Sequence, residues 1–390
     1  MSIMKPTRNL LLVLCPMLVL GFLYYSSGKL HLRVWGQKSQ SDVDSSLSVG
    51  HQRASVYDKQ GFLLKLDGKL PLDLSYKYGN LSEGTCKPGY AAAKMTAIYP
   101  KFIKPAPMFL DRNFKRLGKV SNYLPPFGFK TQEKIISDIL SLTKNYGLGP
   151  ELDSMNCKRC IIVGNGGILA NKSLGSRIDE YDVVVRLNEA PVTGYVKDVG
   201  SKTTIRITYP EGAIQKPERY EKDSLFVFSA FKPLDFKWLR QMVHKEKLLG
   251  IEDFSLSLSF PWQRGTEGFW KSVAQHVPKE PSEMRILNPY FIQEAAFQFI
   301  GLPLNNGLMG KGNIPTLGTV AITMALHNCD EVAVAGFGYD MNAPHAPLHY
   351  YETVKMSAIK ESWTHNISKE KEFLRKLVKS RVIADLTNGI

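Results

Sequence analysis

The stretch from Cys160 to Asn188 constrains this chain more than any other. It opens with Cys-Ile-Ile-Val, an apolar and β-branched run typical of a fully buried strand, and the run stops at Gly164, Gly166 and Gly167. Glycines let a backbone approach a ligand closely, and a helix beginning there would offer unpaired N–H groups and the positive end of its dipole. We therefore expect a helix after the glycines and a phosphate site where the strand ends.

A second apolar run, at residues 183–185, is followed by Arg186 and Asn188. Asn188 is thus expected just past the carboxyl end of a strand, the edge at which open α/β sheets bind ligands. A dinucleotide site is the competing interpretation, but its fingerprint requires Gly or Ala where this chain has Leu169, and a carboxylate near Arg186 and Asn188. The residues therefore favour a nucleotide phosphate over NAD, while a tight turn without a ligand stays open.

Short strand-like runs alternate with helical spacing along most of the chain. Helical spacing occurs over residues 132–146, over 290–298 and after Thr316, which is a natural N-cap. Further strand-like runs lie at residues 203–207, 225–228, 284–289 and 332–335. This alternation predicts a single α/β domain, Rossmann-like, with a largely parallel twisted sheet flanked by helices. Residues 248–268 break the alternation and are expected to form a loop insertion.

A second glycine-tipped strand follows the helix that begins near Thr316. Gly318 lies in the first turn of that helix, and Gly336 and Gly338 end the run Val-Ala-Val-Ala. The chain thus repeats a helix start and a close backbone approach, which we expect to serve the rest of a nucleotide. Glycines that serve packing alone are the alternative.

Two histidines are candidates for acid–base chemistry. His349 is followed by Tyr-Tyr-Glu, and His365 precedes a helix expected over residues 368–380. The positive end of a helix disfavours a protonated imidazole, so His365 is expected to stay neutral and able to accept a proton. Glu370 falls in the first turn of the same helix, where a negative charge is favourable.

The N-terminus predicts a membrane anchor, because Lys5 and Arg8 precede an apolar run over residues 10–25. A cleaved signal peptide is the alternative. We expect a cytosolic tail at 1–9, a signal-anchor transmembrane helix at 10–27, a flexible Ser-rich stem at 28–56 and a lumenal catalytic domain at 57–390.

The formal net charge of +14 suits a nucleic acid, a membrane surface or an anionic substrate. Lys and Arg are spread along the chain without basic blocks interleaved with aromatic residues, so we expect no nucleic-acid partner.

If the domain is lumenal, its cysteines can form disulfides and its sequons can be glycosylated. Beyond the apolar run the cysteines are Cys86, Cys157, Cys160 and Cys329. Their even number in an oxidising compartment predicts two disulfides, and a four-cysteine zinc site is the less favoured alternative because only one Cys-x-x-Cys pair exists. N-glycosylation sequons begin at Asn80, Asn171 and Asn366.

Four ordered segments resemble the motifs of animal sialyltransferases. Residues 160–209 resemble the large sialyl motif, 315–337 the small motif and 349–352 motif III, while His365 with Glu370 resembles the very-small motif. The resemblance covers residues 57–390, and residues 336–340 and 349–352 are most similar to the β-galactoside α-2,3-sialyltransferases of the family.

The resemblance implies a variant glycosyltransferase-A fold and a single-pass type II protein of the Golgi membrane. The implied reaction moves sialic acid from CMP-sialic acid to the 3-hydroxyl of terminal galactose in Galβ1-3/4GlcNAc glycans of glycoproteins or glycolipids, with inversion. It implies no cofactor and no metal, and the one Asp-x-Asp, Asp42-Val43-Asp44, lies in the expected stem. A catalytically inactive Golgi glycan-binding protein of the same fold, another nucleotide-sugar transferase and a lumenal NAD oxidoreductase are the alternatives.

The resemblance also assigns roles to residues. Asn165 and Asn188 would hold the CMP part of the donor, with Thr316, Gly318 and Gly338 lining the same pocket. His349 would meet the donor phosphate, and His365 would be the general base. Cys160 would pair with Cys329, which leaves Cys86 for Cys157. Ile314 stands where some relatives have a tyrosine at the donor.

Overall fold

The computed structural model describes residues 86–246, 267–305, 309–310, 312–340, 342–358 and 364–390. The expected tail, anchor and stem, the sequon at Asn80 and nearly all of the expected 248–268 loop lie outside these residues. Within them, no helix has both the length and the apolar character needed to cross a membrane. All the described residues belong to one compact unit.

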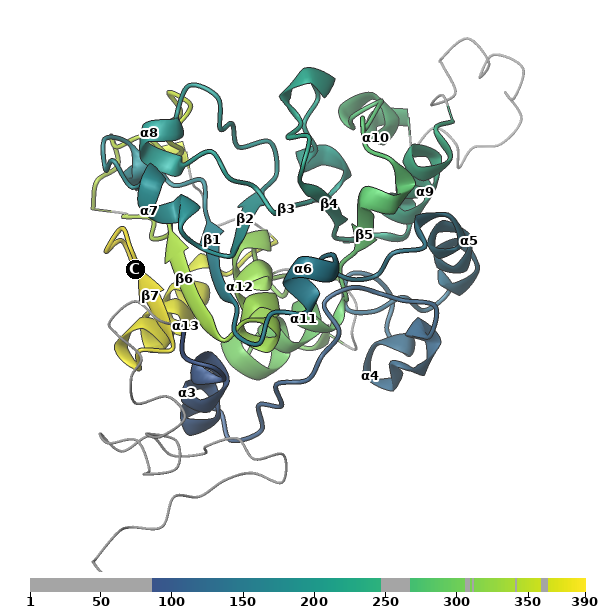
Figure 1. The fold of residues 1–390 in the computed structure, drawn as a ribbon, viewed down its shortest axis with the longest axis horizontal. Coiled ribbons are helices and arrows are strands. Elements are labelled where there is room, and N and C mark those ends of the chain that lie inside the picture. The colour runs from purple at the N-terminus through teal and green to yellow at the C-terminus, as the bar shows by residue number, and fades with distance from the viewer. Residues whose placement is uncertain (1–85, 247–266, 306–308, 311, 341, 359–363) are drawn as a thin grey trace, which may run out of the picture. The chain divides into compact units, whose positions relative to one another are not determined.

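Seven strands in this part of the chain form one sheet (Figure 1). They are β1 Arg159–Val163, β2 Val183–Leu187, β3 Ile205–Thr208, β4 Leu225–Phe228, β5 Met284–Ile286, β6 Glu331–Ala335 and β7 Ile383–Asp385. Their order is β5-β4-β3-β2-β1-β6-β7, and every neighbouring pair is parallel. The chain runs outward from β1 through β5 and then returns to the other side of β1 with β6, so the switch point of the topology lies between β1 and β6. Ligands of open α/β sheets bind at such a point.

Helices cover both faces of the sheet (Figure 1). They are α3 Tyr90–Ile98, α4 Gly118–Ser121, α5 Glu133–Thr143, α6 Pro150–Asp153, α7 Gly175–Asp179, α8 Val196–Val199, α9 Pro233–His244, α10 Glu267–Ser272, α11 Tyr290–Glu294, α12 Leu317–Asn328 and α13 Ile367–Lys379, and α11 continues as a π-helix, Ala295–Ile300.

The side chains of β1 alternate between two apolar layers. Cys160 and Ile162 join the larger core, which includes α12, whereas Ile161 and Val163 join a smaller core with Ile178 of α7 and Val199 of α8. Strands covered on both faces need apolar side chains at successive positions, which explains the uninterrupted runs in the sequence.

The structure confirms the predicted α/β fold with a parallel sheet, and the predicted strand and helix positions agree with it to within a few residues. The prediction of a helix directly after the glycines that follow β1 is wrong. A 3₁₀ turn, Gly167–Leu169, and the five-residue α7 stand there instead, because the amides of Gly166 and Gly167 donate to Gly336 O and Leu348 O rather than facing a ligand. Strand β7 was not predicted.

Two disulfides join the segments as the resemblance implied: Cys86 with Cys157 and Cys160 with Cys329, each with a Cα–Cα distance of 6.0 Å. They use the four sulfurs that a zinc site would have needed. The second bond ties the start of β1 to the residue that follows α12.

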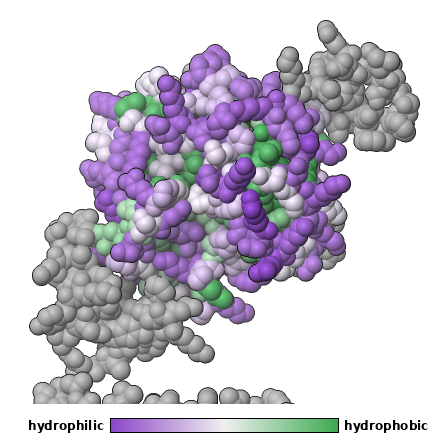
Figure 2. All heavy atoms as spheres, turned by 45° about the vertical axis from the view of Figure 1, so that its right-hand side comes forward, coloured by the Kyte–Doolittle hydropathy of each residue, from purple (hydrophilic) through white to green (hydrophobic). Residues whose placement is uncertain are grey.

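The face shown in Figure 2 is mainly hydrophilic, with small separate apolar patches. Exposed large apolar side chains are likewise scattered in sequence: Ile103, Leu142, Val196, Leu304, Met309 and Val354. Isolated exposed apolar residues are normal for a globular protein.

Candidate active site

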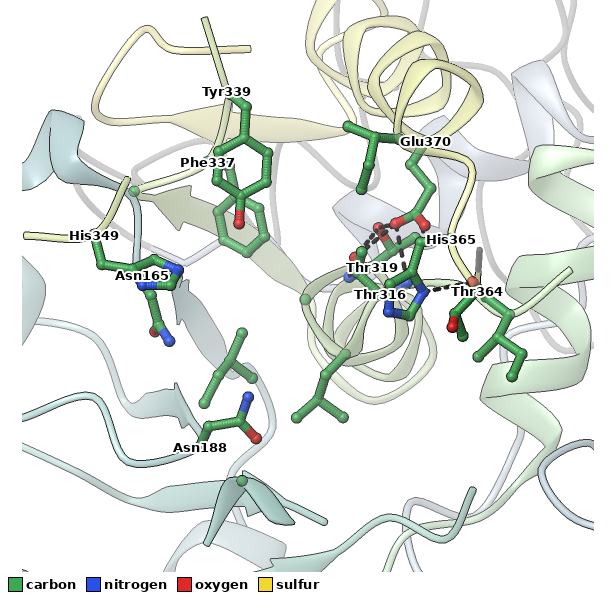
Figure 3. A pocket seen from close by; sticks show the side chains of 18 of the residues that line it. Asn165, Asn188, Thr316, Thr319, Phe337, Tyr339, His349, Thr364, His365 and Glu370 are labelled. Carbon is green, nitrogen blue, oxygen red and sulfur yellow. Dashed lines mark hydrogen bonds between the residues drawn. The ribbon is translucent and has the colours of Figure 1, made fainter. Parts of the chain in front are cut away.

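A cavity of about 780 Å³ opens where β1, β2 and β6 end. Its wall contains all seven residues to which the resemblance assigned a donor or base role: Asn165, Asn188, Thr316, Gly318, Gly338, His349 and His365. Figure 3 shows Asn165 and His349 on one side of the cavity and Thr316 and His365 on the other. The topology thus brings together residues that are up to 200 positions apart in the chain.

The glycines after β1 allow two strand tips to approach each other. Gly164 N donates to Ala335 O at 2.8 Å, and Gly166 N donates to Gly336 O at 3.0 Å. A Cβ on Gly164 or on Gly166 would lie 2.6 Å from Gly336 O, which a real side chain could not tolerate. The close backbone approach predicted for these glycines is real, but it serves the junction of β1 with β6.

This junction also places His349. Gly167 N donates to Leu348 O at 3.0 Å and Tyr350 N donates to Asn165 O at 3.1 Å, so residues 348–350 lie antiparallel to residues 165–167. His349 therefore stands beside Asn165 in the cavity wall (Figure 3).

The neighbours of His349 fix its ring. Its Nδ1 is hydrogen-bonded to the Glu352 carboxylate, and the ring stacks on Tyr351 with centroids 5.4 Å apart and planes 14° apart. A carboxylate oxygen accepts, so Nδ1 carries the hydrogen and Nε2 is the atom left to meet a ligand. Burial raises the pKa of Tyr351 to about 12, so its hydroxyl stays protonated.

Asn165 carries an unsatisfied acceptor. Its Nδ2 lies 3.5 Å from the Tyr351 hydroxyl, whereas its Oδ1 is buried and has no partner among the described residues. Buried polar atoms are rarely left unpaired. This oxygen suits an amino or hydroxyl donor on a bound ligand.

Asn188 enters the cavity from a left-handed turn. It follows β2 as expected, with φ of 52°, a conformation that asparagine adopts more readily than most residues. Its N–H donates to Ile207 O at 2.9 Å, which continues the ladder with β3. Gly212 packs against its side chain: a Cβ on Gly212 would lie 2.5 Å from Asn188 Oδ1.

The start of α12 faces the cavity and is held by α13. Thr316 is the N-cap of α12, as predicted, and its hydroxyl accepts from Thr319 N at 3.4 Å. Glu370 of α13 accepts from Thr316 N at 2.9 Å and from the hydroxyls of Thr316 and Thr319 at 2.6 Å each (Figure 3). Glu370 is buried, which raises the pKa of its carboxyl even though three donors favour the charged form. Beyond its place in the first turn of α13, this carboxyl joins two helix starts.

His365 is oriented by the backbone before α12. Its Nδ1 lies 2.8 Å from Ile314 O. A carbonyl can only accept, so Nδ1–H is the donor, and in the neutral ring the lone pair is on Nε2. That tautomer is the one a general base requires. Ile314 lines the cavity, and its carbonyl holds the histidine.

Part of the remaining wall is aromatic, and no role was predicted for its residues. Tyr209 and Phe231 meet edge to face with centroids 5.4 Å apart, and Phe337 and Tyr339 follow β6. Tyr209 and Phe337 come directly after β3 and close to the end of β6, so the rule that ligands bind at the carboxyl edge of the sheet could have identified them. Lys232 also lines this part of the wall.

In the part of the chain that the structure describes, no three His, Cys, Asp or Glu side chains gather where they could hold a metal ion. Glu352, which is bonded to His349, and Glu370, in the cavity wall, are already engaged by hydrogen bonds from His349 and from the two threonines at the start of α12.

Comparison with known proteins agrees with this arrangement. The model of the family described as glycosyltransferase family 29 (sialyltransferase) matches residues 109–382. The CMP-N-acetylneuraminate-beta-1,4-galactoside alpha-2,3-sialyltransferases of Homo sapiens and Mus musculus are 66% and 65% identical to this chain over 390 residues, which is all of this chain and all of theirs. The lactosylceramide alpha-2,3-sialyltransferase of Homo sapiens is 40% identical over 308 residues, covering 78% of this chain and 71% of its own.

A solved structure shares the fold. A crystal structure of a mammalian sialyltransferase superposes with a TM-score of 0.55 at 21% identity, covering 78% of this chain and 98% of its own. A second, of a mammalian sialyltransferase in complex with Gal-beta-1-3GalNAc-ortho-nitrophenol, gives a TM-score of 0.54 at 22% identity with the same coverage.

Proposed function

Because this chain belongs to glycosyltransferase family 29, the sialyltransferases, we propose that it transfers sialic acid from CMP-sialic acid to the 3-hydroxyl of a terminal β-galactoside. The chain is a glycosyltransferase, and its identity of 65–66% to α-2,3-sialyltransferases over the full length supports this reaction rather than an inactive glycan-binding protein or an NAD enzyme. The single observation that carries the mechanism is the placement of His349 and His365 on facing sides of one cavity (Figure 3).

The donor nucleotide would occupy the β1–β2 side of the cavity. There Asn165 offers its unpaired Oδ1, and Asn188 offers an amide from its left-handed turn. Thr316 and Gly318, at the start of α12, and Gly338, after the end of β6, would line the rest of the nucleotide's pocket. Gly338 has φ of 95°, and a Cβ there would lie 1.7 Å from Gly389 O, so this position requires glycine.

The phosphate would meet His349. With Nδ1–H directed at Glu352, a protonated ring presents Nε2–H to a phosphate oxygen. That hydrogen bond would stabilise the charge that grows on the phosphate as it leaves.

The acceptor hydroxyl would be activated by His365 from the facing side. Nε2 removes the proton from the galactose 3-hydroxyl while the oxygen attacks C2 of sialic acid, the bond from C2 to the phosphate oxygen breaks, and CMP departs. A nucleophile and a leaving group on facing sides of one carbon give inversion in one step. General-base catalysis of this kind contributes about 10²–10⁴-fold. No step calls for a metal or another cofactor.

The acceptor would lie against the aromatic wall that contains Tyr209 and Phe231. Since the relatives that are 65–66% identical are named for β-1,4-galactosides, we propose a β1,4-linked galactose as the preferred acceptor.

The cellular setting is part of the same proposal. The basic tail and apolar run of residues 1–25 would anchor a type II protein in the Golgi membrane, with the catalytic domain in the lumen and in a variant glycosyltransferase-A fold. Two disulfides in the described residues are in keeping with an oxidising lumen. Asn171 is exposed and would be accessible for glycosylation.

A product assay tests the function. The full chain in detergent is given labelled CMP-sialic acid and lactosamine with a β1,4 or a β1,3 galactose, together with lactosylceramide, and the product linkage is determined by NMR. We expect an α2,3 product, formed fastest on the β1,4 galactoside. A product of any other linkage, or release of CMP that does not depend on the acceptor, contradicts the proposal.

A further inference from the structure

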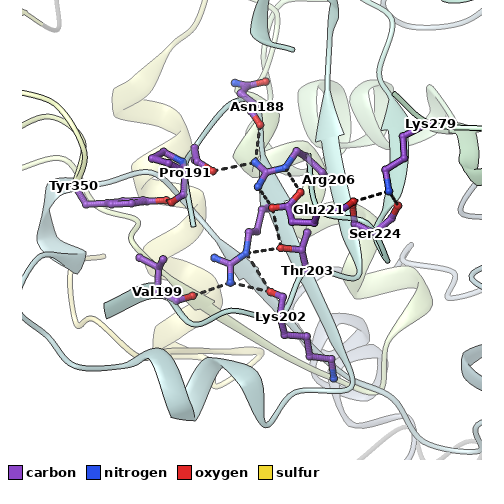
Figure 4. Close-up of polar contacts among 12 residues, drawn as sticks. Asn188, Pro191, Val199, Lys202, Thr203, Arg206, Glu221, Ser224, Lys279 and Tyr350 are labelled. Atoms are coloured by element: carbon purple, nitrogen blue, oxygen red, sulfur yellow. Dashed lines mark hydrogen bonds and ion pairs between the residues drawn. The ribbon is translucent and has the colours of Figure 1, made fainter. Parts of the chain in front are cut away.

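Two arginines lie side by side in the interior, on β2 and β3. Arg186 and Arg206 are register partners of the parallel pair and are only 1% and 2% exposed. Burial of a charge is costly unless hydrogen bonds and opposite charges compensate for it. The partners of each guanidinium therefore indicate what it is for (Figure 4).

Arg206 is hydrogen-bonded to the turn that contains Asn188. Its Nη1 donates to Asn188 O at 2.7 Å and to Ala190 O at 3.1 Å, so two carbonyls of one turn converge on one nitrogen (Figure 4). The N–H of Asn188 is bonded to Ile207 O on the next residue of the same strand. The backbone of Asn188 is thus held on both sides, by β3 alone, in the left-handed conformation that directs its side chain into the cavity.

Glu221 holds the charge of Arg206. Its carboxylate accepts from Nε at 3.0 Å and also from Nη2, in a two-pronged ion pair. Burial acts to raise the pKa of Glu221, but the hydrogen bond and charge of Arg206 outweigh it and hold the pKa below its ordinary value. Glu221 is itself placed by Lys279, whose Nζ donates to Glu221 O at 2.6 Å and to Ser224 O at 2.7 Å.

Arg186 is as buried as Arg206 and has the same side chain, but its hydrogen-bond partners are different. Its Nη2 donates to Val199 O and to Lys202 O at 2.8 Å each, and its Nε donates to Thr203 Oγ1 at 2.9 Å. Val199 ends α8, Lys202 and Thr203 lie in the turn before β3, and none of the three lines the cavity. Burial lowers the pKa of Arg186 to about 10, which still leaves it charged at neutral pH.

We propose that Arg206, with Glu221 as its counter-ion, is a positioning residue for the donor nucleotide, because it sets the turn from which Asn188 meets CMP. This inference rests on the proposed function in one respect, the contact of Asn188 with CMP. Arg206 does not line the cavity and does not touch the substrate itself. Its effect passes through the carbonyls of Asn188 and Ala190.

The test compares Arg206→Met with Arg186→Met in the full chain in detergent. Both variants remove one buried guanidinium, and both are expected to lower the unfolding temperature. Calorimetric titration with CMP should show a Kd about ten- to a hundredfold higher for Arg206→Met, since a misplacement of about 1 Å in a binding group can cost that much. Arg186→Met should stay within about threefold of the unaltered chain. Equal Kd values for the two variants overturn the inference.

A second pair of measurements separates positioning from general stability. Arg206→Met leaves the half-buried carboxylate of Glu221 without its counter-ion, so the double variant Arg206→Met, Glu221→Gln should regain unfolding temperature without regaining CMP affinity. In kinetics the loss should appear in KM for CMP-sialic acid, with kcat largely recovered at saturating donor. Recovery of CMP affinity together with stability overturns the inference. Failure of the unaltered chain to bind CMP would overturn the proposed function and this inference together, whereas normal CMP affinity in Arg206→Met would overturn the inference alone.

Discussion

Substitution of Gly212 by alanine should displace Asn188 without disturbing the fold. A Cβ on Gly212 would lie 2.5 Å from Asn188 Oδ1 and 2.8 Å from its Cγ, so one of the two side chains has to give way. The two closest atoms belong to the far end of an asparagine side chain, which can rotate, and Tyr209 Cε1 follows at 3.0 Å. The φ of Gly212 is not among the positive values, so alanine fits its backbone.

The magnitude follows from the contact distance. An ordinary contact begins at 3.4 Å, so Asn188 Oδ1 must retreat by about 0.9 Å. A hydrogen bond of about 2.9 Å to the nucleotide would lengthen to about 3.8 Å, which is beyond hydrogen-bonding distance. Loss of one such bond costs about 1.4 kcal/mol, or tenfold in the Kd for CMP. In contrast, Gly→Ala at a compatible φ changes the free energy of unfolding by less than about 1 kcal/mol.

The assay pairs calorimetric titration with CMP and thermal unfolding. Gly212→Ala should bind CMP about tenfold more weakly with an unfolding temperature within about 3 °C of the unaltered chain. Gly118→Ala is the matched control, because Gly118 lies in α4 with no atom within 4 Å of an added Cβ. The two variants should therefore differ in their effect on the cavity wall, chiefly at Asn188.

A double-variant cycle isolates the cause. Asn188→Gly removes the side chain and keeps a residue that tolerates φ of 52°, so Gly212→Ala should have no further effect on CMP affinity in that background. Unchanged CMP affinity in Gly212→Ala alone, or an equal loss in the Asn188→Gly background, would refute the assignment of Asn188 to the donor nucleotide.

Four further predictions follow from the same geometry. His365→Ala should lower kcat by about 10²–10⁴-fold while CMP binding measured by titration stays unchanged, and retained turnover would exclude His365 as the base. EDTA should leave the transfer rate unchanged, and a rate restored only by added divalent cation would establish a metal requirement. Since Arg206 lowers the pKa of Glu221 in the folded chain, the pair stabilises the fold above the ordinary glutamate pKa of 4.5 and loses that contribution as the pH falls through and below it. Glu221→Gln should therefore show a shallower loss of unfolding free energy between about pH 5 and pH 3 in chemical denaturation. Asn366 adjoins His365 of the cavity wall, so a glycan on its Nδ2 would crowd the site: glycopeptide mapping should find Asn366 unmodified in active protein, and active protein that carries a glycan there would contradict this prediction.

Periodicity predicted the sheet because its central strands are buried on both faces. The runs Cys-Ile-Ile-Val of β1 and Val-Ala-Val-Ala of β6 have no polar position to interrupt them, and each ends at a glycine that marks the carboxyl edge. The same signal fails for β7, Ile383–Asp385, which is three residues long at the edge of the sheet and has an exposed central residue. It also fails for the segment after β1, because the amides of Gly166 and Gly167 are used by another strand and a loop.

The positions of site residues were predictable where they follow strands or open helices. Asn188 and Thr316 illustrate both cases. The role of Arg206 was not predictable, because Ile-Arg-Ile on β3 has the alternation typical of a strand with its arginine facing solvent. Both faces of this sheet are covered, so the arginine is buried instead, and its partners Asn188 and Glu221 lie 18 and 15 residues away. Ion pairs between a strand and a distant turn leave no local pattern that a sequence reading can detect.

The side of the cavity with His349 and the side with His365 are both connected to one helix, α12. Its last turn is tied to β1 by the bond between Cys329 and Cys160, and its first turn is tied to α13 through Glu370. No face of this helix is exposed to solvent, since every residue from Leu317 to His327 is buried. A helix fixed at both ends and packed all round cannot slide by a turn, which would move its start by about 5.4 Å. The position of His365 relative to the end of β1 is therefore set through rigid elements. No direct bond between the two sides of the cavity is needed to keep His365 facing the bound nucleotide.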